Sequence, residues 1–487
     1  MTNDELLAQI NRAEAEGWTA LDLSGQALRC LPPEIGNLTQ LETLILGKAE
    51  EWKWVDTHRV PVVIGNEIET LPPELLQLTQ LKILNLSGNP LKALPDTLAH
   101  MPQLSELTAI QTGLTEIPEF LGQLSNLRLL DLSNNKIKAI PAVIAQLVNL
   151  TALALCNNKL RKIPAFIGQL TQLIRLELSN NQLRKLPETI AQLIHLKELT
   201  LSNNQFKEIP STLGQLFNLS NLYASNNRIA AIPPSIGELS NLTELALSNN
   251  HIECIPQEIG KLSRLNSLYL YNNKIRAIPA QIGQLTQLTK LTLSSNQIDV
   301  IPDEIQNLSQ LNILALANNR ITAIPEAIGR LDNLAKLYLS NNEIEEIPTA
   351  LSHLRQLTEL HLYRNQIKEI PAALSQLGQL RQLYLHANQI EEIPEVLSQL
   401  TNLSVLALSE NRIENVPEAI GSLFNLQTLA LNHNRLTAIP DTIGQLTNLT
   451  ESYLSNNQIR AIPDAVGRLT KLSRLDLENN SIEEGQE

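Results

Sequence analysis

The sequence predicts an α/β solenoid, in which short strand-and-turn repeats stack on one another, and three observations support this prediction. Segments of 23 residues recur along nearly the whole chain. The hydrophobic content is 43% but the aromatic content only 3%, so the core must be built from Leu, Ile and Ala. Each repeat also carries Leu, Asn and Pro at fixed slots. One such unit cannot bury its apolar face alone, whereas stacked units can.

The period defines the number of units. Residues 81–471 hold 17 consecutive units of 23 residues without a slip. Residues 18–40 form another unit, and residues 41–80 form one with 17 extra residues, which we place at 49–65. A partial unit begins at Leu472. We therefore predict 19 full units and one fragment.

Each slot of the unit has a physical reason. Slots 1, 4 and 6, such as Leu127, Leu130 and Leu132, place leucines on one side of a short strand. Slot 9 is Asn in 18 of 20 copies, with Gln26 and Thr112 as the exceptions. Because a buried carboxamide both donates and accepts, stacked Asn side chains can satisfy backbone groups of the adjacent turn. Slot 15 is Pro in all 19 full units, which suits an extended return segment followed by a short helical turn.

The N-terminal segment 1–17 reads as an amphipathic helix that caps the first strand. Leu6 and Ile10 have helical spacing, Asn3 is a candidate N-cap, and Gly17 follows as a stop. We therefore expect this helix to cover the apolar end of the first repeat.

The C-terminal end has no equivalent cap in the sequence. The solenoid is predicted over 18–482, and Leu475, Leu477 and Ile482 begin another unit before an acidic tail at 483–487. Bare strand edges invite pairing. Three readings stay open: the tail protects a frayed last turn, a downstream domain covers the edge, or two such edges meet in a dimer.

Composition limits the classes of partner. The formal net charge is −13 and the pI about 5.2, which disfavours nucleic acid and anionic membranes as partners. The N-terminus lacks the basic and apolar regions of a signal peptide, and no apolar run reaches the ~18 residues of a bilayer span. The cysteines are odd in number and scattered (Cys30, Cys156, Cys254), which fits a reducing compartment. We expect a cytoplasmic protein.

Motifs for catalysis are missing from the sequence. It contains no GxxxxGK[ST] phosphate loop, CxxC, HExxH or GxSxG. His361 and His386 fall on neighbouring predicted strands, but two histidines without a third ligand are a weak metal signal. We predict no enzymatic activity, no cofactor and no metal site.

The pattern LxxLxLxxNxIxxIPxxIGxLxxL over 18–482 resembles the leucine-rich repeat family. The resemblance implies a curved right-handed solenoid with a parallel sheet on the concave face and short helices or turns on the convex face. The 23-residue form with Ile-Pro is similar to the intracellular subclass. That subclass includes Ras-binding leucine-rich scaffolds, plant Ras-group repeat proteins, disease-resistance-type repeats and the N-terminal repeats of bacterial Roco GTPases.

Slots 3, 5 and 7 point away from the leucine core, so they form the surface of the sheet. All seven tyrosines occupy slot 5 or 7. The strand propensity of Tyr explains this placement, but it explains less well why tyrosines gather in the C-terminal half. The seven are Tyr223, Tyr269, Tyr271, Tyr338, Tyr363, Tyr384 and Tyr453.

A contact surface is the functional interpretation, because Tyr and Arg are enriched in binding hot spots. The densest patch is a mildly basic aromatic strip on three successive strands, made of Lys336, Tyr338, His361, Tyr363, Arg364, Arg381, Tyr384 and His386. The face is acidic further towards the N-terminus, at Glu106, Asp131, Glu177, Glu198 and Glu244. Such polarity could orient a ligand, although scattered surface charges often serve only solvation.

The insertion at 49–65 holds two of the three tryptophans, Trp52 and Trp54. Its alternation suggests a small hairpin. Insertions in repeats often serve binding, and the alternative is that the two tryptophans pack back onto the edge of the solenoid.

We therefore interpret the chain as a non-enzymatic protein-interaction module or scaffold that binds a protein on its concave face. The resemblance implies a small GTPase or a signalling protein as the partner. One alternative is the sensor arm of a multidomain Roco-type GTPase, whose catalytic domain would follow Glu487. A second alternative is an exported effector or recognition protein.

Overall fold

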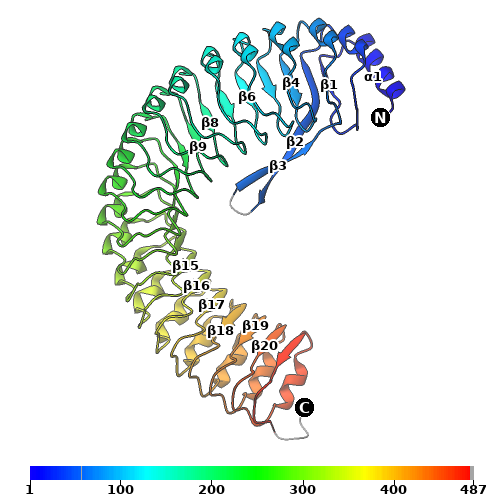
Figure 1. The fold of residues 1–487 in the computed structure, drawn as a ribbon. Helices are drawn as coiled ribbons and strands as arrows, with labels where there is room; N and C mark the ends of the chain where they lie inside the picture. The colour runs from blue at the N-terminus through cyan, green and yellow to red at the C-terminus, as the bar shows by residue number, and fades with distance from the viewer. Residues whose placement is uncertain (56–57, 483–487) are drawn as a thin grey trace. The chain divides into compact units, whose positions relative to one another are not determined.

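A computed structural model describes residues 1–482 apart from 56–57, without the side chains of 52–60. The acidic tail predicted at 483–487 lies outside the described residues. In the described part, short strands alternate with five-residue 3₁₀ helices (Figure 1). This alternation is the predicted α/β repeat fold.

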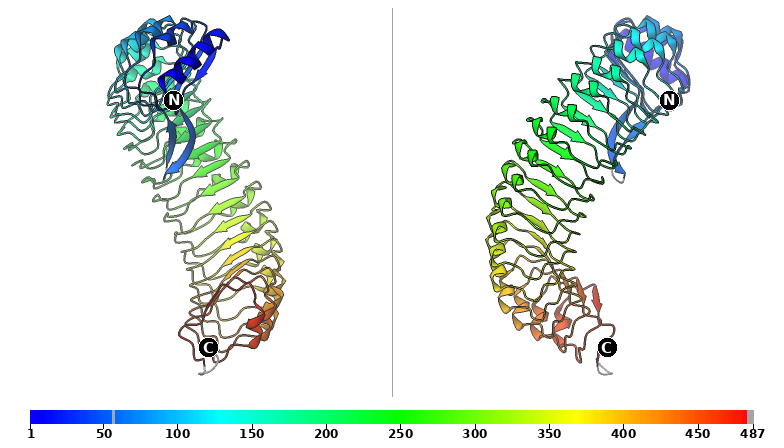
Figure 2. Two further views of the ribbon diagram at one scale, coloured as in Figure 1. Left: turned by 90° about the vertical axis from the view of Figure 1, so that its right-hand side faces the viewer. Right: turned by 60° about the vertical axis from the view of Figure 1, so that its left-hand side comes forward.

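The chain divides into two compact units, Met1–Asn250 (unit 1) and His251–Glu487 (unit 2). The strands of unit 1 are β1 (Ala20–Asp22), β2 (Thr43–Val55), β3 (His58–Ile64), β4 (Ile83–Leu86), β5 (Glu106–Thr108), β6 (Leu129–Asp131), β7 (Ala152–Ala154), β8 (Arg175–Glu177), β9 (Glu198–Thr200), β10 (Asn221–Tyr223) and β11 (Glu244–Ala246). Those of unit 2 are β12 (Ser267–Tyr269), β13 (Lys290–Thr292), β14 (Ile313–Ala315), β15 (Lys336–Tyr338), β16 (Glu359–His361), β17 (Gln382–Tyr384), β18 (Val405–Ala407), β19 (Thr428–Ala430), β20 (Glu451–Tyr453) and β21 (Arg474–Asp476). Within each unit the strands lie side by side on one face and the 3₁₀ helices cover the other (Figure 2).

A proline in extended conformation precedes every 3₁₀ helix, as slot 15 predicts. Pro164, for example, has φ −71° and ψ 152°, and its carbonyl accepts the N–H of Ile167 at 3.1 Å. In unit 1 the 3₁₀ helices are η1 (Pro33–Asn37), η2 (Pro73–Gln77), η3 (Asp96–His100), η4 (Glu119–Gln123), η5 (Ala142–Gln146), η6 (Ala165–Gln169), η7 (Glu188–Gln192), η8 (Ser211–Gln215) and η9 (Pro234–Glu238). In unit 2 they are η10 (Gln257–Lys261), η11 (Ala280–Gln284), η12 (Asp303–Asn307), η13 (Glu326–Arg330), η14 (Thr349–His353), η15 (Ala372–Gln376), η16 (Glu395–Gln399), η17 (Glu418–Ser422), η18 (Asp441–Gln445) and η19 (Asp464–Arg468).

Neighbouring repeats pair in parallel, slot against slot. Leu153 lies opposite Leu176 in unit 1, and Leu337 lies opposite Leu360 in unit 2. These leucines are at most 1% exposed. The aliphatic core therefore runs between the sheet and the 3₁₀ helices, and each full burial of a Leu stabilises the fold by about 1.5–3 kcal/mol.

The asparagine at slot 9 ties each repeat to the one before it, as predicted. Nδ2 of Asn158 donates to the carbonyl oxygens of Leu155, in its own repeat, and of Leu132, in the preceding repeat, at 3.2 and 3.0 Å. Its Oδ1 accepts the N–H of Ile137, also in the preceding repeat, at 2.9 Å. The same contacts recur along both units, and we call this row of side chains the asparagine ladder.

The residue before each ladder asparagine, at slot 8, has an unusual backbone conformation that the sequence analysis missed. Its backbone is left-handed in repeat after repeat, for example in Asn134 and Asn157 with φ of 58° and 54°. Asn tolerates this conformation better than most residues with a Cβ. Arg364 and Ala387 adopt it in unit 2 with φ of 53° and 54°, without that tolerance.

The N-terminal helix α1 (Asn3–Ala15) lies within the predicted segment 1–17, but its N-cap is Thr2, and Asn3, the expected N-cap, is the first helical residue. The Thr2 hydroxyl accepts the N–H of Glu5 at 3.3 Å, and the Glu5 carboxylate accepts the N–H of Thr2 at 2.7 Å. This reciprocal pair is a capping box, which requires Thr and Glu three residues apart. Gly17 follows with φ +66°.

The insertion in the second repeat extends β2 into an antiparallel hairpin with β3. Residues Thr43 to Ile45 of β2 pair in parallel with β4, and the segment from Lys48 to Val55 pairs with β3. The root of the hairpin passes so close to the next repeat that a Cβ at Gly65 would clash with the backbone of Gly88. The side chains of Trp52 and Trp54 lie outside the described residues, so their contacts stay a prediction.

The three cysteines are free thiols. Cys30 in unit 1 and Cys254 in unit 2 are exposed, whereas Cys156 is buried.

We predict that Asn204→Ala destabilises unit 1 by about 2–4 kcal/mol, because a buried carboxamide is lost and its backbone partners are left unpaired. Oδ1 of Asn204 accepts the N–H of Leu183 at 3.0 Å, and Nδ2 donates to the Leu178 carbonyl at 3.0 Å. Hydrogen exchange should show faster exchange of the Leu183 amide, and urea unfolding a lower midpoint. The control Gln205→Ala removes the neighbouring polar side chain and should change neither. Unchanged protection of Leu183 would show that the ladder does not hold this amide.

Candidate functional site

Three neighbouring strands of unit 2 bring five rings together. We call them the aromatic cluster, and its members are Tyr338, His361, Tyr363, Tyr384 and His386. β15, β16 and β17 pair with Tyr338, His361 and Tyr384 directly opposite one another. The ring centroids of Tyr338 and His361 are 4.7 Å apart, and those of His361 and Tyr384 4.4 Å. Two residues further along the chain, Tyr363 and His386 stack at 4.3 Å with planes 9° from parallel. All five side chains are half-buried, so they support one another and still face solvent.

A carboxylate that the sequence analysis missed lies beside the cluster. Glu359 occupies slot 3 of its repeat, accepts a hydrogen bond from the Tyr338 hydroxyl at 2.7 Å, and forms an ion pair with the Lys336 ammonium at 2.7 Å. Glu359 therefore balances the charge of Lys336 within the strip, while Arg364 and Arg381 keep their positive charges. Inspecting slot 3 together with slots 5 and 7 would have found it.

Burial sets the protonation of the cluster. It lowers the pKa of both His361 and His386, so both rings are neutral at pH 7. Burial, followed by the hydrogen bond to Glu359, raises the pKa of Tyr338. Burial alone would raise the pKa of Glu359, but Lys336 and Tyr338 together lower it. At neutral pH the site is therefore an uncharged ring surface beside one ion pair.

The two predicted arginines lie outside these strands. Arg364 follows β16 and Arg381 precedes β17, and both side chains are exposed. The left-handed backbone of Arg364 places it on the turn at slot 8, and Arg381 occupies slot 2. Neither residue belongs to the ring contacts of the cluster.

The remaining tyrosines lie on other strands. In unit 2, the Lys290 ammonium lies 5.5 Å from the ring centroid of Tyr269, and Tyr271 follows two residues after the end of β12. The Tyr453 hydroxyl donates to Glu451 at 3.0 Å. Tyr223 belongs to unit 1. Each of these tyrosines therefore has its own surroundings, apart from the cluster.

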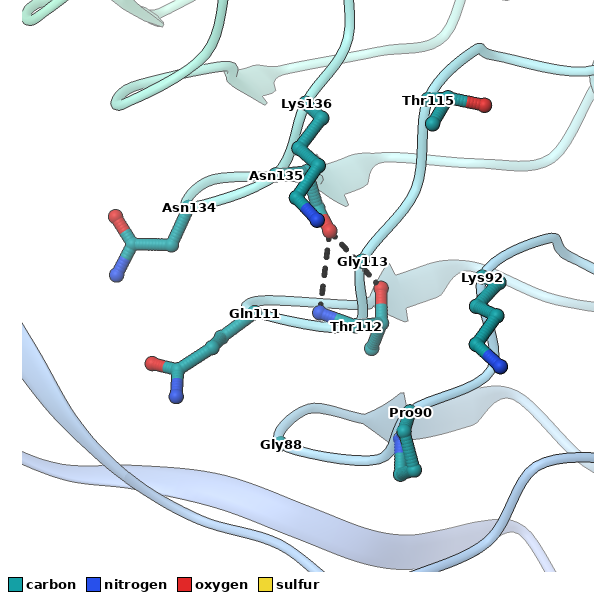
Figure 3. A pocket seen from close by; sticks show the side chains of 10 residues that line it. All are labelled: Gly88, Pro90, Lys92, Gln111, Thr112, Gly113, Thr115, Asn134, Asn135 and Lys136. Carbon is teal, nitrogen blue, oxygen red and sulfur yellow. Dashed lines mark hydrogen bonds between the residues drawn. The ribbon is translucent and has the colours of Figure 1, made fainter.

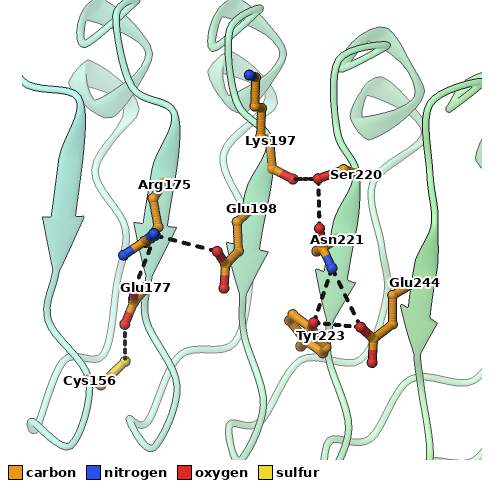
Figure 4. Close-up of polar contacts among 9 residues, drawn as sticks. All are labelled: Cys156, Arg175, Glu177, Lys197, Glu198, Ser220, Asn221, Tyr223 and Glu244. Carbon is orange, nitrogen blue, oxygen red and sulfur yellow. Dashed lines mark hydrogen bonds and ion pairs between the residues drawn. The ribbon is translucent and has the colours of Figure 1, made fainter.

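The concave face of unit 1 is acidic over its later strands (Figure 4). Nε of Arg175 lies 3.7 Å from the carboxylate of Glu177 and 3.4 Å from that of Glu198. The Tyr223 hydroxyl donates to Glu244 at 2.8 Å. The predicted acidic side chains lie on β5, β6, β8, β9 and β11, and are Glu106, Asp131, Glu177, Glu198 and Glu244.

Burial makes one of these carboxylates titrate near neutrality. Burial, with a further contribution from the charge of Asp131, raises the pKa of Glu177 to about 7. Burial likewise raises the pKa of Asp131. The thiol of Cys156 lies 3.9 Å from the Glu177 carboxylate, and burial, followed by that carboxylate's charge, raises the pKa of Cys156. The thiol therefore stays protonated and unreactive at neutral pH.

A depression of about 660 Å³ opens in unit 1 where the asparagine ladder is interrupted (Figure 3). Thr112 takes the place of Asn there, and its hydroxyl reaches only Ala109 and Asn135, at 3.1 and 3.2 Å. Leu91, whose amide would meet a ladder asparagine, instead donates to the backbone carbonyl of Asn89 at 2.8 Å. The depression thus lies beside the repeat in which Thr replaces the ladder asparagine. Its lining is Gly88, Pro90, Lys92, Gln111, Thr112, Gly113, Thr115, Asn134, Asn135 and Lys136.

The described residues contain no group of three His, Cys, Asp or Glu side chains that could hold a metal ion. His361 and His386, the weak candidates of the sequence, instead contact aromatic rings. In the same part of the chain, no helix is long and apolar enough to cross a bilayer.

We predict that Glu177→Gln stabilises the protein at pH 8 by about 2 kcal/mol, since one pKa unit corresponds to about 1.4 kcal/mol and the group is not fully buried. The raised pKa means that the folded state holds this proton more tightly than the unfolded state. The stabilising effect of the proton is complete below pH 4.5, the ordinary value, and is lost as the pH rises through about 7.

Urea unfolding of the Glu177→Gln variant and the native chain at pH 4 and pH 8 measures this difference. For the exposed control Glu208→Gln, the difference in unfolding free energy from the native chain should be the same at pH 4 and pH 8. If this difference is also the same at both pH values for Glu177→Gln, the raised pKa is contradicted.

Comparison with known proteins identifies the family. The model described as a leucine-rich repeat region matches residues 165–250, 234–316, 299–411 and 397–485. Models of two-copy and single leucine-rich repeats match 125–168 and 80–101. No curated protein matches the sequence.

Solved structures agree with the family models. A leucine-rich repeat protein of Leptospira interrogans is 35% identical, with 81% of this chain and 98% of that chain covered and a TM-score of 0.74. The plant peptide hormone receptor RGFR1, in complex with RGF2, is 28% identical, with 92% and 80% covered and a TM-score of 0.74. The Arabidopsis receptor kinase HAESA, in complex with the peptide hormone IDA and the co-receptor SERK1, is 27% identical, with 96% and 87% covered and a TM-score of 0.67.

The repeat slots, the parallel strands with their 3₁₀ helices and these matches agree with one another. The chain belongs to the leucine-rich repeat family.

Proposed function

We propose that the chain is a non-enzymatic protein-interaction module whose aromatic cluster binds a protein partner. The supporting observation is the contact of five rings from three consecutive strands, which are preordered yet half-exposed. Because the rings already restrict one another, little side-chain freedom is lost on binding. Tyrosine is also among the residues that dominate binding energy at interfaces.

The neighbours of the cluster leave room for a partner. In the row that holds Tyr338, His361 and Tyr384, the next residue on each side is an alanine, Ala315 on β14 and Ala407 on β18. The rings therefore stand above their flanks as a ridge. A partner that grips this ridge gains contact with ring faces and edges on both sides, in addition to the ion pair beside it.

The comparisons support protein binding in general. The solved complexes of RGFR1 and HAESA hold peptide or protein ligands. The resemblance of the 23-residue repeat to intracellular scaffolds favours a small GTPase or another signalling protein, met in the cytoplasm, as the partner of this chain. This finer assignment rests on analogy at the level of the fold.

We predict that Tyr338→Ala/Tyr363→Ala/Tyr384→Ala loses the partner. Truncating three hot-spot rings should cost at least about 3 kcal/mol, or ~100-fold in affinity. The measurement is affinity capture from the native cell extract, with identification by mass spectrometry and titration of the captured protein. Circular dichroism should first show that the variant folds normally.

The matched control removes three tyrosines outside the cluster, all at slot 5, in the variant Tyr223→Ala/Tyr269→Ala/Tyr453→Ala. It should capture the partner as the native chain does. Equal capture by the cluster variant would refute the cluster as the binding site and direct attention to the hairpin with Trp52 and Trp54. If only the control variant loses the partner, the binding site must instead include Tyr223, Tyr269 or Tyr453.

A further inference from the structure

The two ends of the repeat stack differ in how their apolar faces are covered. At the N-terminal end, α1 packs against η1 and buries Leu6, Ile10 and Ala13. At the other end, Leu475 of β21 is 37% exposed, whereas Leu429, at the same slot two repeats earlier, is fully buried.

Other apolar slots of the last repeat follow the same trend. Leu472, Leu477 and Ile482 are half-buried, although their counterparts in the preceding repeat are at most 2% exposed. Those counterparts are Leu449, Leu454 and Ile459. Within the described residues, the last repeat thus presents a cross-section of the aliphatic core.

The backbone at this edge is also open. Arg474 donates its N–H to the carbonyl of Thr450 at 3.1 Å, and the carbonyl of Asp476 accepts the N–H of Leu454 at 2.8 Å. Both residues therefore face β20, with which β21 pairs. Successive residues of a strand direct their N–H and C=O groups to opposite edges, so those of Leu475 face outward. Among the described residues β21 pairs with β20 alone, and β3 pairs with β2, so that side of β21 has no strand partner there.

We propose that β21 pairs in antiparallel fashion with β21 of a second copy of this chain, about a two-fold axis through Leu475. In this register the outward N–H and C=O of Leu475 exchange hydrogen bonds with the same groups of its copy. Arg474 then lies opposite Asp476 of the copy on the concave face, and Asp476 lies opposite Arg474. Residues directly opposite have Cβ atoms about 4.5–5.5 Å apart, within reach of an ion pair.

The charges select this arrangement over the alternatives. Parallel pairing of two copies of β21 in register would put like charges opposite each other. Head-to-tail addition in the register of the repeats would bring β21 against β1 and place Asp476 opposite Asp22, which are like charges. A two-fold contact uses the same edge of both copies, so assembly through it stops at the dimer.

The contacts that Arg474 and Asp476 make within one chain leave both side chains free to form the ion pairs between two copies. The guanidinium of Arg474 lies over the Tyr453 ring at 4.9 Å and is exposed. One carboxylate oxygen of Asp476 accepts from the Ser455 hydroxyl at 2.9 Å. An ionised carboxylate has about four acceptor positions and a guanidinium five donors, so each can keep its partner and add another.

Sedimentation velocity of the full chain over a wide concentration range tests the proposal. The native chain should pass from 54.1 kDa to twice that mass as the concentration rises. Arg474→Asp and Asp476→Arg each convert both attractive pairs into repulsive ones, so each should weaken the dimer at least ~10-fold. Neither side chain is part of the core, and circular dichroism should show native folding for both.

Charge complementarity provides the decisive control. An equimolar mixture of the Arg474→Asp and Asp476→Arg chains should form a heterodimer, and the double variant Arg474→Asp/Asp476→Arg should dimerise like the native chain. A native chain that stays monomeric at every concentration overturns the proposal. It is equally overturned if the single variants dimerise unchanged, or if neither the mixture nor the double variant recovers the dimer.

Discussion

The carboxamide at slot 9 joins a repeat to its predecessor, because it donates to carbonyls of both repeats and accepts an amide of the earlier one. This contact fixes the 23-residue step, and the step in turn keeps equal slots in rows across the sheet. The rings of the aromatic cluster meet only because Tyr338, His361 and Tyr384 share such a row. Where Thr112 interrupts the ladder, the backbone finds other partners and a depression opens. Core packing, surface rows and local irregularities therefore all depend on one polar side chain per repeat.

The two units use the same rows for different chemistry. In unit 2 the cluster is uncharged and aromatic, with a single balanced ion pair beside it. In unit 1 carboxylates gather around Arg175, and burial brings Glu177 close to its titration point at neutral pH. The leucine core beneath is almost identical in the two units, so the difference comes entirely from residues that the fold leaves free to vary.

The sequence was sufficient for the fold because period, leucine slots, asparagine and proline all indicate the same unit. It also located the cluster, since slots 5 and 7 follow from the two-residue alternation of a strand. It missed Glu359 because the slot pattern does not show that this side chain meets Lys336 and Tyr338 of the preceding repeat. It also grouped Arg364 and Arg381 with the rings, and the structure places Arg364 after the end of β16 and Arg381 directly before β17. The pKa of Glu177 could not be predicted, because its cause is burial among neighbouring repeats. The N-cap was wrong by one residue, since both Thr2 and Asn3 are good capping residues and only the reciprocal contact with Glu5 distinguishes them.

The distribution of thiols has a practical consequence. Cys30 and Cys254 are exposed, one in each unit, whereas Cys156 is buried and its raised pKa keeps it protonated. Maleimide dyes should therefore attach at two positions of the native chain without any mutagenesis. Energy transfer between the two dyes would act as a spectroscopic ruler from one unit to the other. Because neither thiol belongs to the aromatic cluster or to β21, the labels would report on movement of the units when a ligand is added, while both surfaces stay chemically unmodified.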